Sequence, residues 1–105
     1  MWFSVSFLYR SMRTPDGGKE PLWLESIRLL DALSEEDAEA QAKQIARSDE
    51  HSYEVDSGAT VTWTFVSIER VFQIDSRDLT SGTEVFSRFL RSSEAESLLR
   101  PFDDD

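Results

Sequence analysis

The chain has 105 residues, of which 39% are hydrophobic and 11% aromatic, and this size and composition fit one compact domain with one core. Acidic residues outnumber basic residues by 21 to 11, and the resulting formal net charge of -10 argues against nucleic acid and anionic membranes as partners. The chain has no cysteine, which excludes disulfides, thiolate nucleophiles and cysteine-based metal sites. No apolar run approaches the ~20 residues that cross a bilayer, and residues 1–13 lack the basic leader of an export signal, so we expect a cytoplasmic protein.

The N-terminal third predicts a β-hairpin. Alternating apolar and polar residues predict a strand at residues 2–10. Its core face consists of Phe3, Val5, Phe7 and Tyr9. The sequence Thr-Pro-Asp-Gly-Gly at 14–18 is typical of a turn with a glycine exit. A return strand is expected at 22–31, and because its apolar residues occupy both parities, we expect both of its faces to be partly covered.

The clearest helix begins at Ser34, a capping residue followed by three carboxylates at the positive end of the helix dipole. We expect this helix to end near Ser48, and we expect the polar stretch 49–58 after it to be a loop. Its apolar stripe consists of Ala38, Ala42, Ile45 and Ala46. Because these are mostly methyl side chains, the helix must lie close against a sheet.

Residues 59–74 form a β-rich run that exceeds the usual strand length of ~3–10 residues. Its apolar parity changes between Phe65 and Val66, which predicts a bulge or a strong twist. After a turn-rich loop at 75–82, the pattern of residues 83–90 fits a strand or a helix, and the Thr, Val and Phe content favours a strand.

The C-terminal residues predict a short helix that begins at a capping pattern around Ser93 and is closed by Pro101. We expect a single domain at 1–100 and an acidic tail at 101–105. The order β-β-α-β-β, with a terminal helical turn, predicts the α+β class: a mainly antiparallel four-stranded sheet with one helix on one face.

Four segments, in this order, resemble a known family. They are the aromatic strand after Trp2, Leu-Ser-Glu-Glu-Asp-Ala at 33–38, Val-Thr-Trp-Thr-Phe-Val at 61–66 and Gly-Thr-Glu-Val-Phe-Ser-Arg at 82–88. Together they resemble the DUF4288 family, a bacterial family of domains of unknown function, over roughly residues 2–90. The resemblance implies the fold and a bacterial, cytoplasmic setting, and it assigns no catalytic residue.

Candidate chemistry is sparse, and each candidate has a simple structural alternative. His51 follows Asp49 and Glu50, and a His–acid pair can activate a serine, but no nucleophile elbow is present and a loop histidine beside acids is usually solvated. The acidic residues of 49–56 offer oxygen ligands without the calcium-loop pattern. We therefore assign no catalytic residue, no cofactor and no metal.

Two features bear on contact with a partner. Glu84 and Arg88 share one parity of the 83–90 segment, and they form either a surface ion pair or part of a contact face. The three tryptophans, at 2, 23 and 63, are expected to pack on the sheet. An exposed tryptophan would mark an interaction patch, because tryptophan is enriched in binding hot spots.

Negative charge is concentrated in residues 31–56, which hold nine acids and two bases, whereas 1–30 carry a net +1 and 57–105 a net -4. Such a field attracts cationic surfaces, although a charged helix face also serves solubility alone. Our first hypothesis is a small non-enzymatic binding protein, of an inhibitor or immunity type, that docks a basic protein surface. Its candidate contact residues are Glu35, Glu36, Glu39, Asp49, Glu50, Glu54 and Asp56.

The second hypothesis is a small-ligand or regulatory module that binds in a concavity between the sheet and the helix. An enzyme is the third. A sheet edge is also a candidate contact for a homodimer, because unpaired strand edges can pair with a second chain.

Overall fold

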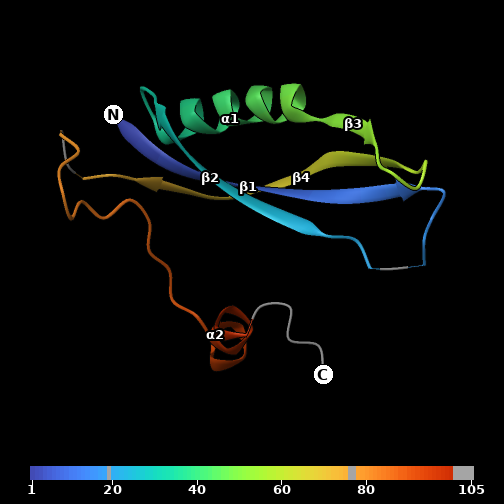
Figure 1. Cartoon of the computed structure of the whole chain (residues 1–105). Helices are drawn as coiled ribbons and strands as arrows, with labels where there is room; N and C mark the ends of the chain where they lie inside the picture. The colour runs from blue at the N-terminus through green and yellow to red at the C-terminus, as the bar shows by residue number, and fades with distance from the viewer. Residues whose placement is uncertain (19, 76–77, 101–105) are drawn as a thin grey trace.

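The computed structural model describes residues 1–18, 20–75 and 78–100 (Figure 1). In chain order the elements are β1 (Trp2–Thr14), β2 (Trp23–Asp31), α1 (Glu35–Asp49), β3 (His51–Glu54), β4 (Thr60–Gln73) and α2 (Ser92–Leu99). The strands form one antiparallel sheet in the order β2-β1-β4-β3, and α1 lies across one face. The predicted α+β class and the order β-β-α-β-β are confirmed.

The fourth strand lies elsewhere than predicted. Residues 83–90 have no regular secondary structure, whereas β3 forms inside the stretch predicted to be a loop. A turn joins β3 to β4, in which the Val55 N–H donates to the Ala59 carbonyl at 2.9 Å and Gly58 has a φ of 85°. Because β3 directly precedes this turn, it pairs locally and occupies the outer edge of β4. In the segment 83–90, Phe86 packs on Phe72 of β4 with ring centroids 6.0 Å apart.

Helix α1 begins as its sequence predicts. The Asp37 N–H donates to Ser34 Oγ at 3.1 Å, and the Asp37 carboxylate accepts from the Leu33 N–H at 3.0 Å, so the first turn is capped on both sides of Ser34. The predicted small-residue stripe faces the sheet: Ala38, Ala42 and Ala46 are fully buried, and Ile45 is partly buried. Since only methyl groups separate the helix from the strands, helix and sheet lie close together.

The core lies between α1 and the central strands. Its β1 side chains are the four that the alternation predicts, Phe3, Val5, Phe7 and Tyr9. On β4 the register with β1 shifts twice, so that Val66 and Glu69 have no partner residue on β1. The shift at Val66 confirms the predicted bulge. Both bulges are needed to keep the apolar residues of β4 on the face under α1, because each extra residue inverts the parity.

Helix α2 begins one residue before the predicted capping serine. Its first turn is closed by the Arg91 N–H, which donates to Glu94 Oε1 at 2.9 Å. It packs against neither α1 nor any strand, and all its residues retain solvent exposure. The predicted closing residue Pro101 and the acidic tail 101–105 lie outside the described residues.

Candidate protein-binding surfaces

One face of the sheet has no helix packed on it, and we call it the open face. Residues directly opposite each other on antiparallel strands project to the same side. Since Phe3, Val5 and Phe7 lie under α1, the alternate residues of β1 and their β2 partners lie on the open face. Its apolar members on these two strands are Trp2, Leu8, Met12, Trp23, Ile27 and Leu29.

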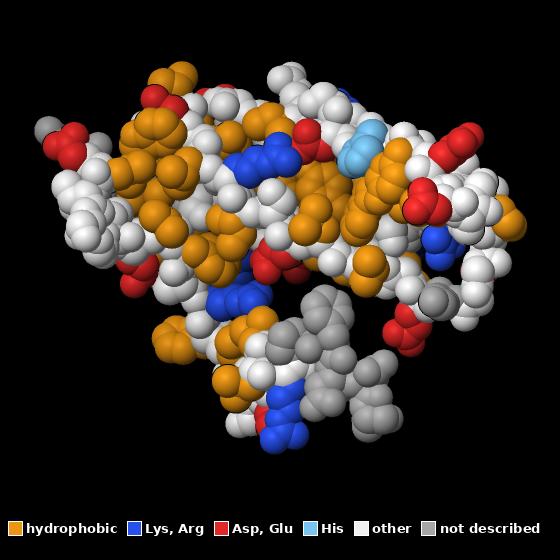
Figure 2. Space-filling view, in the orientation of Figure 1, with side chains coloured by type: hydrophobic (Ala, Val, Ile, Leu, Met, Phe, Trp, Pro, Cys, Tyr) orange, Lys and Arg blue, Asp and Glu red, His pale blue; other side chains and the backbone are white. Residues whose placement is uncertain are grey.

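Strand β2 is much more exposed than predicted. On the open face Trp23 is 50% exposed, Ile27 49% and Leu29 42%, and on the other side Leu24 is 49% exposed. The expectation that both faces of this strand are partly covered is therefore wrong for most of its length, and Leu30 is its one buried large apolar residue. On the α1 side, Leu24 is exposed because α1 packs mainly on β4 and β1, and on the open face neither described helix packs on the sheet. Figure 2 views the molecule from the β2 edge of the sheet, with α1 above it as in Figure 1, and shows hydrophobic side chains spread along this edge.

The segment after β4 covers only part of the open face. Phe86 packs on Phe72 of β4, which lies opposite Ser4 of β1. On the β2 half of the face Trp23 remains 50% exposed, so it meets the condition set for an interaction patch. Trp2 and Trp63 are partly buried, and the guanidinium of Arg10 lies over the Trp23 ring at 5.5 Å.

The seven acidic candidates do not form one surface. Glu35, Glu36 and Glu39 are exposed on the first two turns of α1, where Lys43 pairs with Glu39 at 3.5 Å. Glu54 is exposed at the end of β3, and Asp56 is exposed in the turn after it. Between these groups the outer side of α1 carries Lys43 and Arg47, so the negative charge is divided into two areas rather than gathered.

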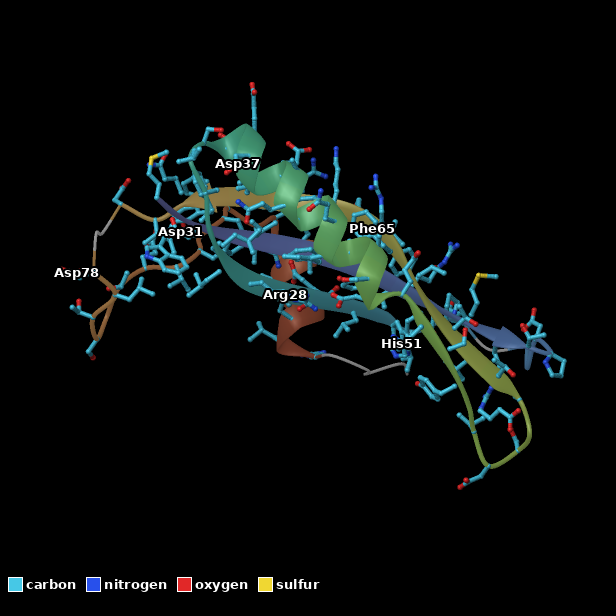
Figure 3. All side chains as sticks on the ribbon, turned by 90° about the horizontal axis from the view of Figure 1, so that it is seen from above. Arg28, Asp31, Asp37, His51, Phe65 and Asp78 are labelled. Atoms are coloured by element: carbon cyan, nitrogen blue, oxygen red, sulfur yellow. The ribbon has the colours of Figure 1, made fainter. Side chains whose placement is uncertain are left out.

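Asp49 belongs to a structural network rather than to a free surface. Its Oδ2 accepts from the Tyr9 hydroxyl at 2.9 Å and pairs with Arg28 Nη2 at 2.6 Å, while the Arg28 guanidinium lies over the Phe7 ring at 5.1 Å. Burial, together with the hydrogen bond to Asp49, raises the pKa of Tyr9 to about 12. Arg28 comes from β2 and reaches toward the end of α1, as Figure 3 shows, so this network ties the edge strand to the helix.

Glu50 and His51 also have local partners. Glu50 Oε2 accepts from the Phe65 N–H at 2.9 Å, beside the bulge at Val66. His51 Nδ1 lies 2.8 Å from the Asp49 carbonyl, and its ring stacks on Tyr53. The structure therefore places His51 at the exposed start of β3, without bringing a serine hydroxyl to it in any hydrogen bond of the described residues.

The expected concavity between helix and sheet is filled by the core side chains. A hollow of about 730 Å³ lies at the other end of the sheet, between the β1–β2 loop and the β3–β4 hairpin. Trp63 and Tyr53 line it, with the Trp63 indole N–H donating to the Tyr53 hydroxyl at 3.2 Å. Its charged lining has both signs, from Arg10, Arg13, Asp16 and Glu20, and selects no class of ligand.

The remaining candidates give no site in the described part of the chain. No group of three or more histidine, aspartate or glutamate side chains is placed there to hold a metal ion. Glu84 and Arg88 are both exposed. Because their segment is not a strand, their spacing does not place them on one face of the sheet. Neither described helix combines the length and apolar character needed to cross a membrane.

Comparison with known proteins agrees with the resemblance seen in the sequence. The model of the family described as a domain of unknown function, DUF4288, matches residues 2–87, which covers β1 to β4 and ends before α2. Comparisons with curated proteins and with solved structures find no significant match. The chain belongs to the DUF4288 family.

Proposed function

We propose that this chain is a non-enzymatic protein-binding module that contacts its partner through the β2 half of the open face. The observation that carries the proposal is the row of Trp23, Ile27 and Leu29, each about half exposed on one side of one strand. Large apolar side chains at the centre of an interface supply most of its affinity, and tryptophan leads that group. A row of this kind on a rigid strand is ready to bind without reordering.

Charge favours a partner whose contact surface is basic. The net charge of -10 gives a negative field around the whole molecule, even though the acidic residues are divided between two areas. Such a field accelerates the encounter with a cationic protein and contributes little to the lifetime of the complex. The carboxylates should therefore affect mainly the association rate, and the apolar contact at β2 mainly the dissociation rate. An inhibitor or immunity-type protein that neutralises a basic toxin is one concrete form of this function.

The test separates the two contributions in one partner recovered from cells with the intact chain. Association and dissociation rates are measured over a range of salt for wild type, for Trp23→Ser and for the triple variant of Glu35, Glu36 and Glu39 to Gln. We leave Glu50 unchanged because its carboxylate caps the Phe65 N–H. The triple variant should slow association at low salt and leave dissociation unchanged, whereas Trp23→Ser should speed dissociation at least tenfold.

The matched control is Leu98→Ser, which removes an apolar side chain of similar exposure, 59%, from α2. It should bind as wild type does. The proposal is overturned if association does not depend on salt, if the contact surface of the partner is acidic, or if Trp23→Ser dissociates no faster than Leu98→Ser.

A further inference from the structure

Strand β2 is an edge strand with unusual freedom to pair. It runs for nine residues in unbroken register with β1 and contains no proline. The opposite edge is formed by the four residues of β3 and then by the part of β4 beyond Trp63, where two bulges interrupt the register. Long, regular and apolar edges are the ones that other strands join, and proteins ordinarily protect such edges with charges, bulges or proline. Here the exposed apolar residues Trp23, Leu24 and Ile27 flank the edge on both sides of the sheet.

Two hydrogen bonds at the ends of the β1–β2 pairing show which residues of β2 point their backbone N–H and C=O groups toward β1. The Ala32 N–H donates to the Met1 carbonyl at 2.9 Å, and the Ser11 N–H donates to the Leu22 carbonyl at 3.0 Å. Because backbone groups alternate between the two sides of a strand, the even-numbered residues of β2 bond to β1. The odd-numbered residues, 23 to 31, therefore point their N–H and C=O groups outward.

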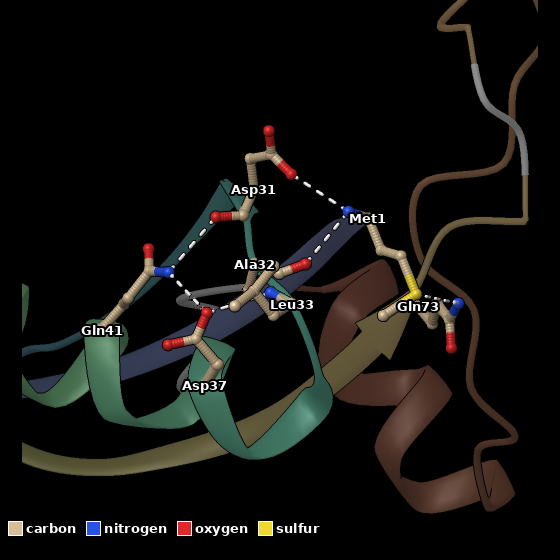
Figure 4. A network of polar contacts seen from close by, with 7 residues as sticks. All are labelled: Met1, Asp31, Ala32, Leu33, Asp37, Gln41 and Gln73. Atoms are coloured by element: carbon tan, nitrogen blue, oxygen red, sulfur yellow. Dashed lines mark hydrogen bonds and ion pairs between the residues drawn. The ribbon is translucent and has the colours of Figure 1, made fainter.

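Among the described residues, contacts within the chain occupy this edge at its C-terminal end. Figure 4 shows the Gln41 amide of α1 donating to the Asp31 carbonyl at 3.2 Å, while the Met1 amine holds the Asp31 carboxylate at 3.1 Å. No such contact is found in the described structure at the outward groups of Trp23, Glu25, Ile27 and Leu29. The part of the edge that is free to pair thus runs from Trp23 to Leu29 and ends at Asp31.

We propose that the occupant of this edge is a second copy of the chain, paired antiparallel to β2 about a two-fold axis at Ile27. In this register Ile27 faces Ile27 of the second copy and Glu25 faces Leu29, and the pairing ends before Asp31, whose carbonyl is held by Gln41. In this register no charged side chain lies opposite a side chain of the same charge. Registers centred on Glu25 or on Arg28 would bring like charges together, which is destabilising between strands.

The dimer goes beyond the protein-binding function and changes its geometry. Edge pairing uses backbone groups, so the side chains of both β2 strands stay on the same side of an eight-stranded sheet. The two open faces then form one continuous surface, with both copies of Ile27 at its centre. A partner bound there would meet twice the apolar row that one chain offers.

The absence of cysteine allows a direct test of the register. In the proposed dimer, Ile27→Cys places two thiols opposite each other with Cα atoms about 5.5 Å apart, within disulfide range. Leu29→Cys is the matched control, since Leu29 has similar exposure on the same face. Its two copies would be four residues out of register, about 14 Å apart, and should not cross-link. Under mild oxidation Ile27→Cys should form covalent dimer and Leu29→Cys should remain monomeric on a denaturing gel.

A second measurement does not depend on cysteine. Sedimentation equilibrium of wild type should show a monomer–dimer equilibrium that Ile27→Lys weakens at least tenfold, whereas Leu98→Lys on α2 leaves it unchanged. Because both copies are acidic, added salt should strengthen the dimer by screening their repulsion, whereas salt weakens binding to a basic partner. The opposite salt dependences distinguish failure of one proposal from failure of the other. Monomeric wild type at all concentrations, cross-linking of Leu29→Cys equal to that of Ile27→Cys, or loss of the dimer in Leu98→Lys would overturn the inference.

Discussion

The contact between α1 and the sheet is the most sensitive place in the fold, and Ala42→Leu tests it. Ala42 is fully buried at the middle of the methyl stripe, so three added carbon atoms have no space unless the helix moves. Overpacking of a tight core costs about 1–3 kcal/mol. We expect the upper half of this range, because lifting the helix also stretches the contacts of Asp49 to Tyr9 and Arg28, at 2.9 and 2.6 Å.

Urea unfolding followed by circular dichroism measures this cost. With a urea dependence of ~1–3 kcal/mol per molar for a small domain, the midpoint should fall by about 1 M. The matched control is Ala40→Leu, at an exposed position of the same helix, since leucine and alanine have nearly equal helix propensities. Equal midpoints for the two variants would show that the stripe does not face the sheet as described, and the packing argument would fail.

Two further predictions concern the polar network and metal independence. The raised pKa of Tyr9 means that the folded state holds this proton more tightly than the unfolded chain, so the free energy of unfolding should fall as the pH rises from 10.0 to about 12. Tyr9→Phe should be less stable at neutral pH by about 0.5–1.5 kcal/mol for the lost hydrogen bond, and its stability should fall less over this pH range; a parallel fall would contradict the assignment. Urea midpoints with and without a strong chelator should coincide, whereas a metal-coupled fold would lose stability to the chelator.

Much of the fold follows from local sequence patterns that agree with the final packing. The Ser34 cap, the methyl stripe of α1 and the Phe3-to-Tyr9 face of β1 each have the period of the element they form, and each is observed. The parity change at Phe65 and Val66 also corresponds to a real bulge. In these places the residues that define the pattern are the same residues that make the core contacts.

Strand β3 was predicted to be a loop, because its local sequence pattern does not match the structure that it forms. Its residues His51 to Glu54 are all exposed, so no apolar alternation marks it as a strand. Its stability comes from the neighbouring β4, through the turn at Gly58 and through pairs such as Ser52 with Thr62, whose hydroxyls lie 2.7 Å apart. The sequence Asp-Ser-Gly at 56–58, between Tyr53 and Val61, is the turn signal that could have revealed this hairpin.

The exposed apolar row of β2, which we propose as the contact surface, was not predicted for a related reason. Periodicity shows which residues of β2 share a face, but it does not show whether a second layer covers that face. The acidic candidates were chosen by charge density along the chain, whereas folding directs Asp49 and Glu50 to the internal partners Arg28 and Phe65. Density along the sequence therefore overestimates the acidic surface, and Trp23 is exposed because it lies on the face of the sheet on which neither described helix packs.

The bulge at Val66 yields a prediction about single-residue deletions. Val66 has no partner on β1, and the residues around it pair Tyr9 with Phe65 and Leu8 with Ser67. Deleting Val66 would remove the bulge and leave these pairs in consecutive order, so every side chain keeps its face. Val66 is also 43% exposed, and little apolar burial is lost with it.

Deleting Thr64, two residues earlier, should have a much larger effect. Thr64 pairs with Arg10 in regular register, so its loss moves Trp63 by one position and turns its side chain to the open face. Full burial of a large apolar side chain is worth about 1.5–3 kcal/mol; Trp63 is partly buried and would lose part of this, together with about 0.5–1.5 kcal/mol for the bond from its indole N–H to Tyr53. Urea unfolding should therefore show the Thr64 deletion to be less stable than the Val66 deletion by at least ~1.5 kcal/mol. Equal losses would show that Val66 is not the extra residue, and that the face of β4 under α1 is set by something other than its bulges.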